Sequence, residues 1–332
     1  MRLGIAIQET WSFFDEIYAD LANNYQTNLF KRRIWKFPIF YSRINRYLFH
    51  HDLQHFMQSN DVVLFEWASE LLAAATRLPK TCGIVTRLHR YEMYEWVNRI
   101  NWDVVDKIIV VSQAKREEFI SRFPDQEAKL IVSSPSISLD KFKPSPKKYS
   151  GDIGTLCHLA PRKRVYELIL AFYELLQCGG EFHLHIGGGH EPVFEDYYIA
   201  MQYLVDELEI RDRVTFYGNV TDPKSWYSNI DIFISNSYSE GLQVALMEAM
   251  ASGCYCLSHK WDGVNEMLLS TQLYFTDREL VEKIINYDKT PEAVKLAMRK
   301  SIREIACEKF DINLTKTQFR QAIEDVRLHA LH

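Results

Sequence analysis

The stretch DIFISNSYSEGLQVALMEAMASGCYCLSHKWDGVNEM, residues 231–267, decides the fold. An apolar run at 232–235 has the length of a strand, and apolar residues from Leu242 onward recur at helical spacing. Gly253 follows where a helix end is expected, and a second apolar run comes after it. The pattern predicts a strand, a sharp turn at Glu240-Gly241, a helix and another strand. This is the repeating unit of a parallel α/β sheet.

Two carboxylates accompany the predicted helix. Glu240 precedes it and Glu248 lies within it, with seven residues between them. Because ligands of open α/β sheets bind at the carboxyl ends of the strands, we expect Glu240 at such a site. The free N–H groups at the helix start, near Gly241 and Leu242, favour a phosphate. Two glutamates at this spacing alone would more often be solvated side chains than a functional pair.

The residues around both acids resemble retaining glycosyltransferases of family four, which have the GT-B fold. Glu240 and Glu248 match the first and last acids of their E-x7-E signature, and D-G-V-N-E at 262–266 resembles their G-G-x-x-E segment, with Asp262 in place of the first glycine. The resemblance implies an α/β protein of two Rossmann-like domains with parallel sheets facing a cleft. It also implies a C-terminal helix that crosses back to the first domain.

The length of 332 residues suits two domains at roughly 150 residues each. We expect an N-terminal, acceptor-side domain at 1–145, to which a helix at 314–332 returns, and a nucleotide-sugar-binding domain at 146–313. The segment 144–150 contains two prolines and two lysines and is predicted to be the linker.

The loop HLAPRKR at 158–164 precedes a predicted helix of the second domain. Lys163 matches a lysine that holds the donor diphosphate in the family, whereas His158 stands where the family has arginine. Histidine offers neither the permanent charge nor the forked hydrogen bonding of arginine, so Arg162 or Arg164 would have to compensate. Without its position before a helix, this loop would be interpreted as a solvated basic turn.

Two further positions of the second domain are candidate donor contacts. Gly187 begins a run of three glycines after a predicted strand, and glycine lets a ligand approach the backbone closely. A short glycine run is more often only a turn. Asn219 lies in a loop that resembles the one that meets the nucleobase in the family.

The resemblance also implies the roles of these residues. Lys163 and the helix start would neutralise charge on the departing diphosphate, which is commonly the largest catalytic effect. Glu248 would hold the ribose hydroxyls, and Glu240 would hold a hydroxyl of the donor sugar. Because no D-x-D pair occurs, we expect no metal and no other cofactor. Retention by same-face attack is favoured over a double displacement through Glu240.

In the first domain, His89 follows a predicted strand at 82–85 and matches a histidine on the acceptor side of the family's cleft. A lone loop histidine is equally well explained as a surface residue, and Arg87 and Glu92 are weaker candidates. The family often has a glycine-rich loop after the first strand, and Q-E-T-W at 8–11 replaces it here.

Residues 30–51 contain six basic side chains, no acid and several aromatic rings. Such a segment could lie on an anionic membrane surface or hold an anionic acceptor. It could equally form a partly buried amphipathic helix whose basic side chains extend to water.

The composition excludes several other classes. A net charge of −5 does not suggest a general nucleic-acid binder, and the six scattered cysteines lack zinc-site spacing. The apolar run at the start is too short for a signal peptide, and no run approaches the roughly 20 apolar residues of a spanning helix. We therefore expect a cytoplasmic protein, or one attached peripherally to the inner face of the membrane.

The interpretation that follows is a retaining hexosyltransferase of polysaccharide biosynthesis. It would transfer sugar from a nucleotide sugar to a glycan or a lipid-linked glycan. Two alternatives stay open. A GT-B sugar-nucleotide epimerase would need no acceptor, and a non-catalytic partner of a transferase is suggested by the histidine at 158.

Overall fold

The computed structural model describes residues 1–11, 14–36 and 41–329. The chain divides into two compact units, Met1–Pro135 with Ile312–His332, and Ser136–Asp311. The boundary between the two units, at 135/136, therefore lies ten residues before the one expected at 145/146. Residues 136–145 pack with the second unit, because Ile137 bridges to Asp311 and Phe142 lies in the core of that unit.

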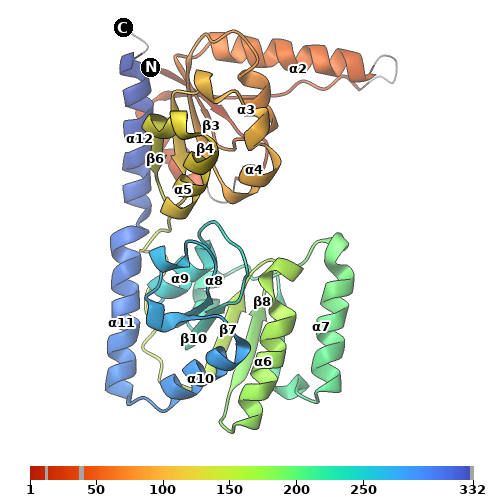
Figure 1. Cartoon of the computed structure of the whole chain (residues 1–332), viewed down its shortest axis with the longest axis vertical. Coiled ribbons are helices and arrows are strands. Elements are labelled where there is room, and N and C mark those ends of the chain that lie inside the picture. The colour runs from red at the N-terminus through yellow and green to blue at the C-terminus, as the bar shows by residue number, and fades with distance from the viewer. Residues whose placement is uncertain (12–13, 37–40, 330–332) are drawn as a thin grey trace. The chain divides into compact units, whose positions relative to one another are not determined.

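The first unit is built on a parallel sheet of six strands in the order β2-β1-β3-β4-β5-β6 (Figure 1). Its strands are β1 (Arg2–Ala6), β2 (Gln26–Leu29), β3 (Val62–Phe65), β4 (Gly83–Leu88), β5 (Lys107–Val110) and β6 (Leu130–Val132). Its helices are α1 (Asp15–Asn24), α2 (Tyr41–Gln58), α3 (Glu70–Ala75), α4 (Arg90–Glu95), α5 (Gln113–Arg122) and α12 (Ile312–His329).

Both faces of this sheet are covered, which explains why its inner strands are continuous apolar runs. Along β3, Val62 and Leu64 pack with α1 and α12, whereas Val63 and Phe65 pack with the cluster that includes α2 and α3. Successive side chains of a strand point to opposite faces, so each run supplies both cores. The packing of α12 against α1, β3 and β4 confirms that the C-terminal helix returns to the first unit.

The second unit has a parallel sheet of six strands in the order β12-β11-β10-β7-β8-β9. The strands are β7 (Asp152–Leu156), β8 (His183–Gly187), β9 (Val214–Gly218), β10 (Ile232–Ser235), β11 (Tyr255–His259) and β12 (Leu273–Tyr274). The helices are α6 (Val165–Gln177), α7 (Glu195–Glu207), α8 (Pro223–Tyr227), α9 (Val244–Ala251), α10 (Asp277–Asp288) and α11 (Glu292–Lys309).

Strand order reverses between β7 and β10 in the second sheet, and between β1 and β3 in the first. Such a reversal separates the loops at the carboxyl ends of two adjacent strands and leaves a crevice for ligands. The loops after β7 and β10 are 157–164 and 236–243. They contain the basic turn and Glu240.

The 231–267 stretch folds in the predicted sequence of elements, with one difference. The helix α9 begins at Val244, two residues later than expected. Leu242 belongs to the loop, because its side chain turns into the core of the unit. The helix ends before Gly253, whose φ of +78° suits glycine at a helix end.

Two edge strands, β2 and β12, were not predicted. The sequence of β2 is polar and only half buried, and β12 has two residues, so neither has the apolar signal of an inner strand. In the basic segment, α2 begins at Tyr41 and continues to Gln58. Residues 37–40 of that segment lie outside the described residues.

The C-terminal half of α2 is anchored through Phe49, Leu53 and Met57. Its first turns extend beyond the sheet (Figure 1). Tyr41 and Tyr47 in these turns are exposed. In the described ranges, no helix is both long enough and apolar enough to span a bilayer. All six cysteines are free thiols.

Candidate functional site

The two loops that flank the strand reversal of the second unit meet at Glu240. Lys163 Nζ is hydrogen-bonded to Glu240 Oε1, and Arg162 NH1 lies 2.8 Å from Glu240 Oε2. Ser237 Oγ donates to Oε1 at 2.6 Å. Lys163 and Glu240 are 77 positions apart in the chain, and the sheet topology alone brings them together.

The Glu240 side chain is only 9% exposed. Burial alone would raise the pKa of its carboxyl. The charges of Lys163 and Arg162, with hydrogen bonds from Lys163 and Ser237, outweigh burial and hold that pKa below its usual value. Glu240 is therefore an ionised carboxylate with both oxygens engaged.

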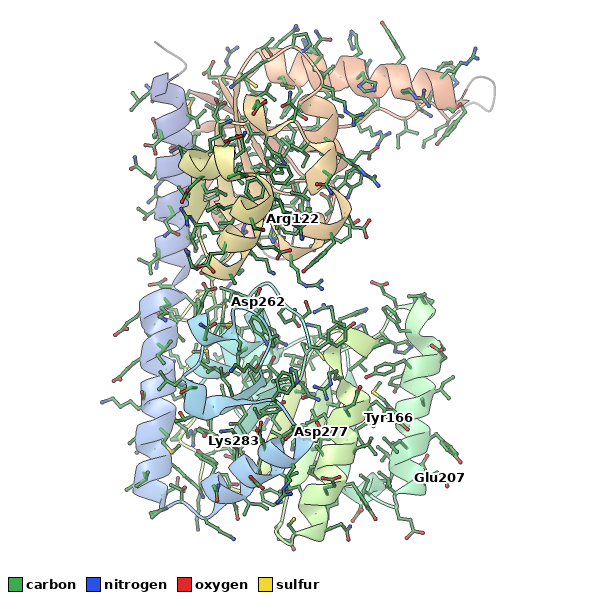
Figure 2. The ribbon with its side chains drawn as sticks, viewed as in Figure 1. Arg122, Tyr166, Glu207, Asp262, Asp277 and Lys283 are labelled. Atoms are coloured by element: carbon green, nitrogen blue, oxygen red, sulfur yellow. The ribbon has the colours of Figure 1, made fainter. Side chains whose placement is uncertain are left out.

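The basic turn is fixed by its own backbone. Pro161–Lys163 forms a single 3-10 turn, and Arg164 follows in the left-handed region at φ 51°. Asn236 Nδ2 donates to the Arg164 carbonyl at 2.8 Å, and the Arg164 guanidinium lies 3.4 Å from Asp277. Figure 2 labels Asp277 at the start of α10. Of the two arginines expected to compensate for His158, Arg162 therefore contacts Glu240, and Arg164 pairs elsewhere.

His158 itself lies apart from this cluster. Its side chain is 45% exposed, and Nε2 lies 3.6 Å from Glu191. Among the described residues, His158 makes no hydrogen bond or ion pair with Glu240 or Lys163. The positive charge next to Glu240 comes from the 162–163 dipeptide.

The start of α9 has no side-chain cap. Gln243 occupies the N-cap position in an extended conformation, and its side chain makes no capping bond. Gly241 and the buried Leu242 precede it, so this segment can offer backbone N–H groups to a ligand but not the Leu242 side chain. An uncapped helix start is where an anion is bound most favourably.

Glu248 lies in the middle of α9 and is partly buried. The Tyr227 hydroxyl lies 3.0 Å from its Oε2 and 2.9 Å from the Ala245 carbonyl oxygen. Burial raises the pKa of Glu248 to about 7, although the Tyr227 hydrogen bond opposes this rise. Tyr227 was not identified from the sequence, and a tyrosine on a short helix carries no signal of this contact.

The glycine run at 187–189 serves the protein's own packing. A Cβ at Gly188 would lie 1.7 Å from the Cys157 carbonyl oxygen, and one at Gly189 would lie 2.4 Å from Asn219 Oδ1. The Leu159 N–H donates to the Gly189 carbonyl at 2.7 Å. The run therefore brings three strand-end loops together, including the one that leads to Lys163. The exposed Asn219 covers Gly189 at this edge.

In the first unit, His89 follows β4 at the carboxyl edge of the sheet. Its ring stacks on Trp67 with centroids 4.1 Å apart, and Nε2 lies 3.5 Å from Glu66 Oε1. His89 Nε2 is buried and has no hydrogen bond to any described residue. It is thus held by stacking rather than by a hydrogen bond.

Glu66 and Arg87 form a buried ion pair beside His89. Arg87 NH1 lies 3.0 Å from Glu66 Oε1, and each side chain is 1% exposed. Glu92 is fully buried, which raises the pKa of its carboxyl. Glu66 was not singled out from the sequence, although an acid directly after an apolar strand is a usable signal.

Two cavities of about 990 and 940 Å³ lie within single units. The first lies in unit one, between α2 and α3, and the second is lined by 260–265 and by residues of β12 and α10. Asp262 and Gly263 line the second cavity. Glu240, Lys163 and Glu248 line neither.

Within the described ranges, no three histidine, cysteine, aspartate or glutamate side chains are placed to hold a metal ion. The expectation of metal-independent chemistry stays a prediction.

Residues 150–287 match the family model Glycosyl transferases group 1. The matched segment contains both loops at the strand reversal, α9 and Glu248. It covers most of the second unit and none of the first.

Two characterised proteins show similarity to part of this chain. The α-monoglucosyldiacylglycerol synthase of Streptococcus pneumoniae is 25% identical over 162 residues, which make up 47% of this chain and 36% of that protein. The N-acetyl-α-D-glucosaminyl L-malate synthase of Bacillus anthracis is 28% identical over 106 residues, or 32% of this chain and 26% of that protein. The matches thus span about a third or less of those proteins.

Solved structures resemble the whole chain. Anabaena HepE in complex with UDP and glucose gives a TM-score of 0.80 at 18% identity, covering 98% of this chain and 99% of that one. The sucrose-phosphate synthase of Thermosynechococcus elongatus gives 0.78 at 15% identity, with 100% of both chains covered. The GT-B fold expected from the sequence is confirmed.

Proposed function

We propose that this protein is a retaining glycosyltransferase that transfers a hexosyl group from a nucleotide sugar to a glycan or lipid-linked glycan acceptor without a metal ion. The observation that carries the proposal is the buried Glu240, joined to Lys163 and Arg162 beside the uncapped start of α9. The family match over 150–287 supports it, since that segment contains all these groups.

The donor diphosphate would lie against Lys163, Arg162 and the first N–H groups of α9. Two cations and a helix start, against the single carboxylate of Glu240, leave this position net positive. Glu248 would accept hydrogen bonds from the ribose hydroxyls. HepE was solved with UDP and glucose, which makes UDP the first nucleotide to test.

In the reaction, the bond between the anomeric carbon and the β-phosphate oxygen breaks, and its electron pair leaves with the nucleoside diphosphate. The acceptor hydroxyl forms the new bond on the same face, and its proton passes to the departing oxygen. Lys163 and Arg162 would stabilise the negative charge that develops on that oxygen.

Glu240 would position the donor sugar through a hydroxyl group and stabilise positive charge on its ring. Its contacts argue against a covalent role, because a nucleophilic carboxylate would first have to lose Lys163, Ser237 and Arg162. For His89 the proposed role is a contact with the acceptor.

A paired set of variants tests the proposal. Glu240→Gln should lower the transfer rate by about 10²-fold or more, because the carboxylate charge acts in the transition state. It should leave the affinity for UDP unchanged or higher, since Lys163 is released for the diphosphate. Lys163→Ala should weaken both transfer and UDP binding. Circular dichroism of both variants controls for folding.

The same assay separates the alternatives. Transfer that persists in EDTA and produces the α-linked product from an α-linked donor supports the proposal. A changed sugar nucleotide formed without acceptor would identify an epimerase. UDP binding with neither transfer nor slow donor hydrolysis would identify a non-catalytic partner. Full activity of Glu240→Gln would refute the role given to that residue.

A further inference from the structure

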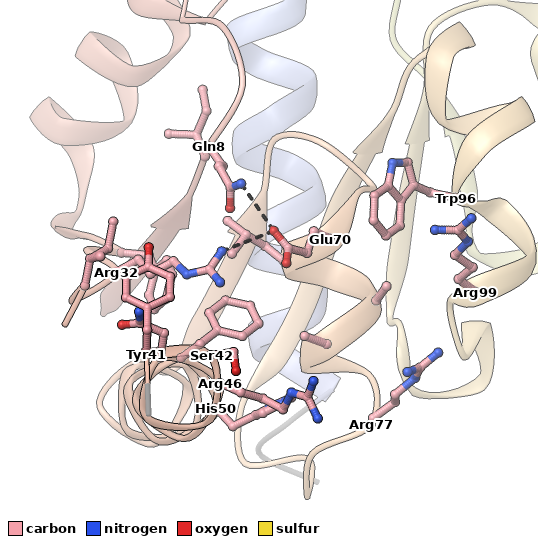
Figure 3. Close-up of a pocket in the computed structure, with 18 residues that line it drawn as sticks. Gln8, Arg32, Tyr41, Ser42, Arg46, His50, Glu70, Arg77, Trp96 and Arg99 are labelled. Atoms are coloured by element: carbon pink, nitrogen blue, oxygen red, sulfur yellow. Dashed lines mark hydrogen bonds and ion pairs between the residues drawn. The ribbon is translucent and has the colours of Figure 1, made fainter. Parts of the chain in front are cut away.

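The cavity of about 990 Å³ in the first unit has no role in the donor chemistry described above (Figure 3). It lies between α2 and α3, next to Ile7 and Gln8 at the carboxyl end of β1. It therefore opens at the same edge of the sheet as His89. No segment matched by the glycosyltransferase family model contributes to it.

The rim of this cavity is strongly basic. Four arginines line it, against a single acid, Glu70; the arginines are Arg32, Arg46, Arg77 and Arg99. Glu70 is already engaged by Arg32 at 3.2 Å and by Gln8 at 3.3 Å. Figure 3 shows this group across the cavity from the guanidinium groups of Arg46, Arg77 and Arg99.

These three arginines are poorly neutralised. The guanidinium groups of Arg46 and Arg77 make no ion pair or hydrogen bond with any described residue, and that of Arg99 lies 4.9 Å from the centroid of the Trp96 ring. Guanidinium groups form forked hydrogen bonds with phosphoryl oxygens, and several of them lining one cavity favour a doubly charged group.

The floor of the same cavity is apolar. Phe49, Leu71 and Ala73 line it and are almost fully buried, and Phe30 and Trp96 extend this surface. Ile34 and Tyr41, exposed by 59% and 50%, stand at its mouth. A free inorganic anion would leave this apolar area in contact with water, whereas an alkyl or prenyl chain would cover it.

We propose that this cavity binds a phosphorylated lipid, with its phosphoryl group on Arg46, Arg77 and Arg99 and its chain on the apolar floor. The inference rests on the proposed function in one respect, since it makes the acceptor a lipid-linked phosphate. The exposed aromatic and basic first turns of α2 place the cavity mouth where a membrane surface would supply such a lipid.

The test uses soluble probes and a matched control. Dodecyl phosphate below its micelle concentration, butyl phosphate, inorganic phosphate and dodecyl maltoside are titrated into the full chain by calorimetry. Arg46→Gln and Arg77→Gln remove charge at the cavity. Arg43→Gln removes the same charge from an exposed position of α2 that does not line it.

Dodecyl phosphate should bind more tightly than the other three probes. Arg46→Gln and Arg77→Gln should each weaken it about tenfold, the usual scale for one charged contact, and Arg43→Gln should change it less than twofold. Equal loss in Arg43→Gln would mean general surface charge and would overturn the site. Equal binding of inorganic phosphate or dodecyl maltoside would overturn the lipid phosphate as its ligand.

A second readout keeps this inference apart from the donor proposal. UDP binding, measured on the same three variants, should match that of the unmodified chain. If UDP fails to bind at all while dodecyl phosphate binds as stated, the donor proposal fails and the lipid-phosphate site stands. If Arg46→Gln or Arg77→Gln abolishes UDP binding, the cavity is part of the nucleotide site and the inference fails.

Discussion

The contact between Glu240 and Lys163 is the residue-scale feature on which the proposed function rests. The motifs that contain Glu240 and Lys163 predicted that both belong to one site, and the structure brings them into contact. The sequence left Arg162 and Arg164 equivalent, because only the left-handed turn at Arg164 sends the two side chains in different directions. Ser237 and Tyr227 were missed, since a single hydroxyl has no pattern that reveals its partner.

The raised pKa of Glu248 gives a prediction for stability. The unfolded carboxyl titrates near 4.5 and the folded one near 7, so the folded protein holds the proton more tightly between these values. Wild-type stability should therefore fall as pH rises through this window and level off above it. Glu248→Gln has no such loss, so its free energy of unfolding should exceed that of wild type by about 1–3 kcal/mol above pH 7.

Denaturant unfolding at several pH values checks this result. The advantage of Glu248→Gln should vanish as the pH falls toward 4.5, the ordinary pKa of a glutamate. The exposed Glu174→Gln serves as a control and should show no pH-dependent difference. A constant difference at all pH values would mean that Glu248 is not buried as described.

At the scale of elements, the loops after the strands matter more to the candidate site than the strands themselves. The apolar runs predicted the inner strands, and their continuity fits strands that are buried on two faces. The 187–189 glycines pack against neighbouring loops, and the donor contact expected at Gly187 stays a prediction. This packing depends on Cys157 and Asn219, which lie far away in sequence.

Gly188→Ala tests the packing role. The substitution puts a methyl group against the Cys157 carbonyl in a conformation with φ of +123°, so it should cost about 3 kcal/mol or more and displace the loop that leads to Lys163. Gly179→Ala is the matched control. Its φ is also positive, at +82°, but nothing lies within 4 Å, so it should cost only about 1 kcal/mol. Thermal unfolding measures both, and equal effects would refute the steric account.

At the scale of the molecule, the sequence predicted two α/β domains and the return of the last helix. The boundary expected from the sequence lies ten residues after the one in the structure. Residues 136–145 have no regular pattern in the sequence, and only the contacts of Ile137 and Phe142 show that they pack with the second unit. The first unit carries less of the resemblance than the second, and the family match is confined to 150–287.

The return of α12 can be tested by unfolding the two units separately. Phe319 is fully buried beside Phe14, so Phe319→Ala should destabilise the first unit by about 3–5 kcal/mol. Calorimetry should show that transition lowered, while the transition that UDP raises keeps its temperature. Leu314→Ala, at a side chain 46% exposed, should change neither. An equal fall of both transitions in Phe319→Ala would show that the units unfold together.

The most direct test of the central claim is the position of a bound nucleotide. Crystals should be soaked with the nucleoside diphosphate that gives the largest thermal shift among UDP, GDP and dTDP. The diphosphate should lie within hydrogen-bonding distance of Lys163 Nζ and the first N–H groups of α9, with the ribose on Glu248. A nucleotide bound in the cavity lined by 260–265, with Lys163 still joined to Glu240, would contradict the account.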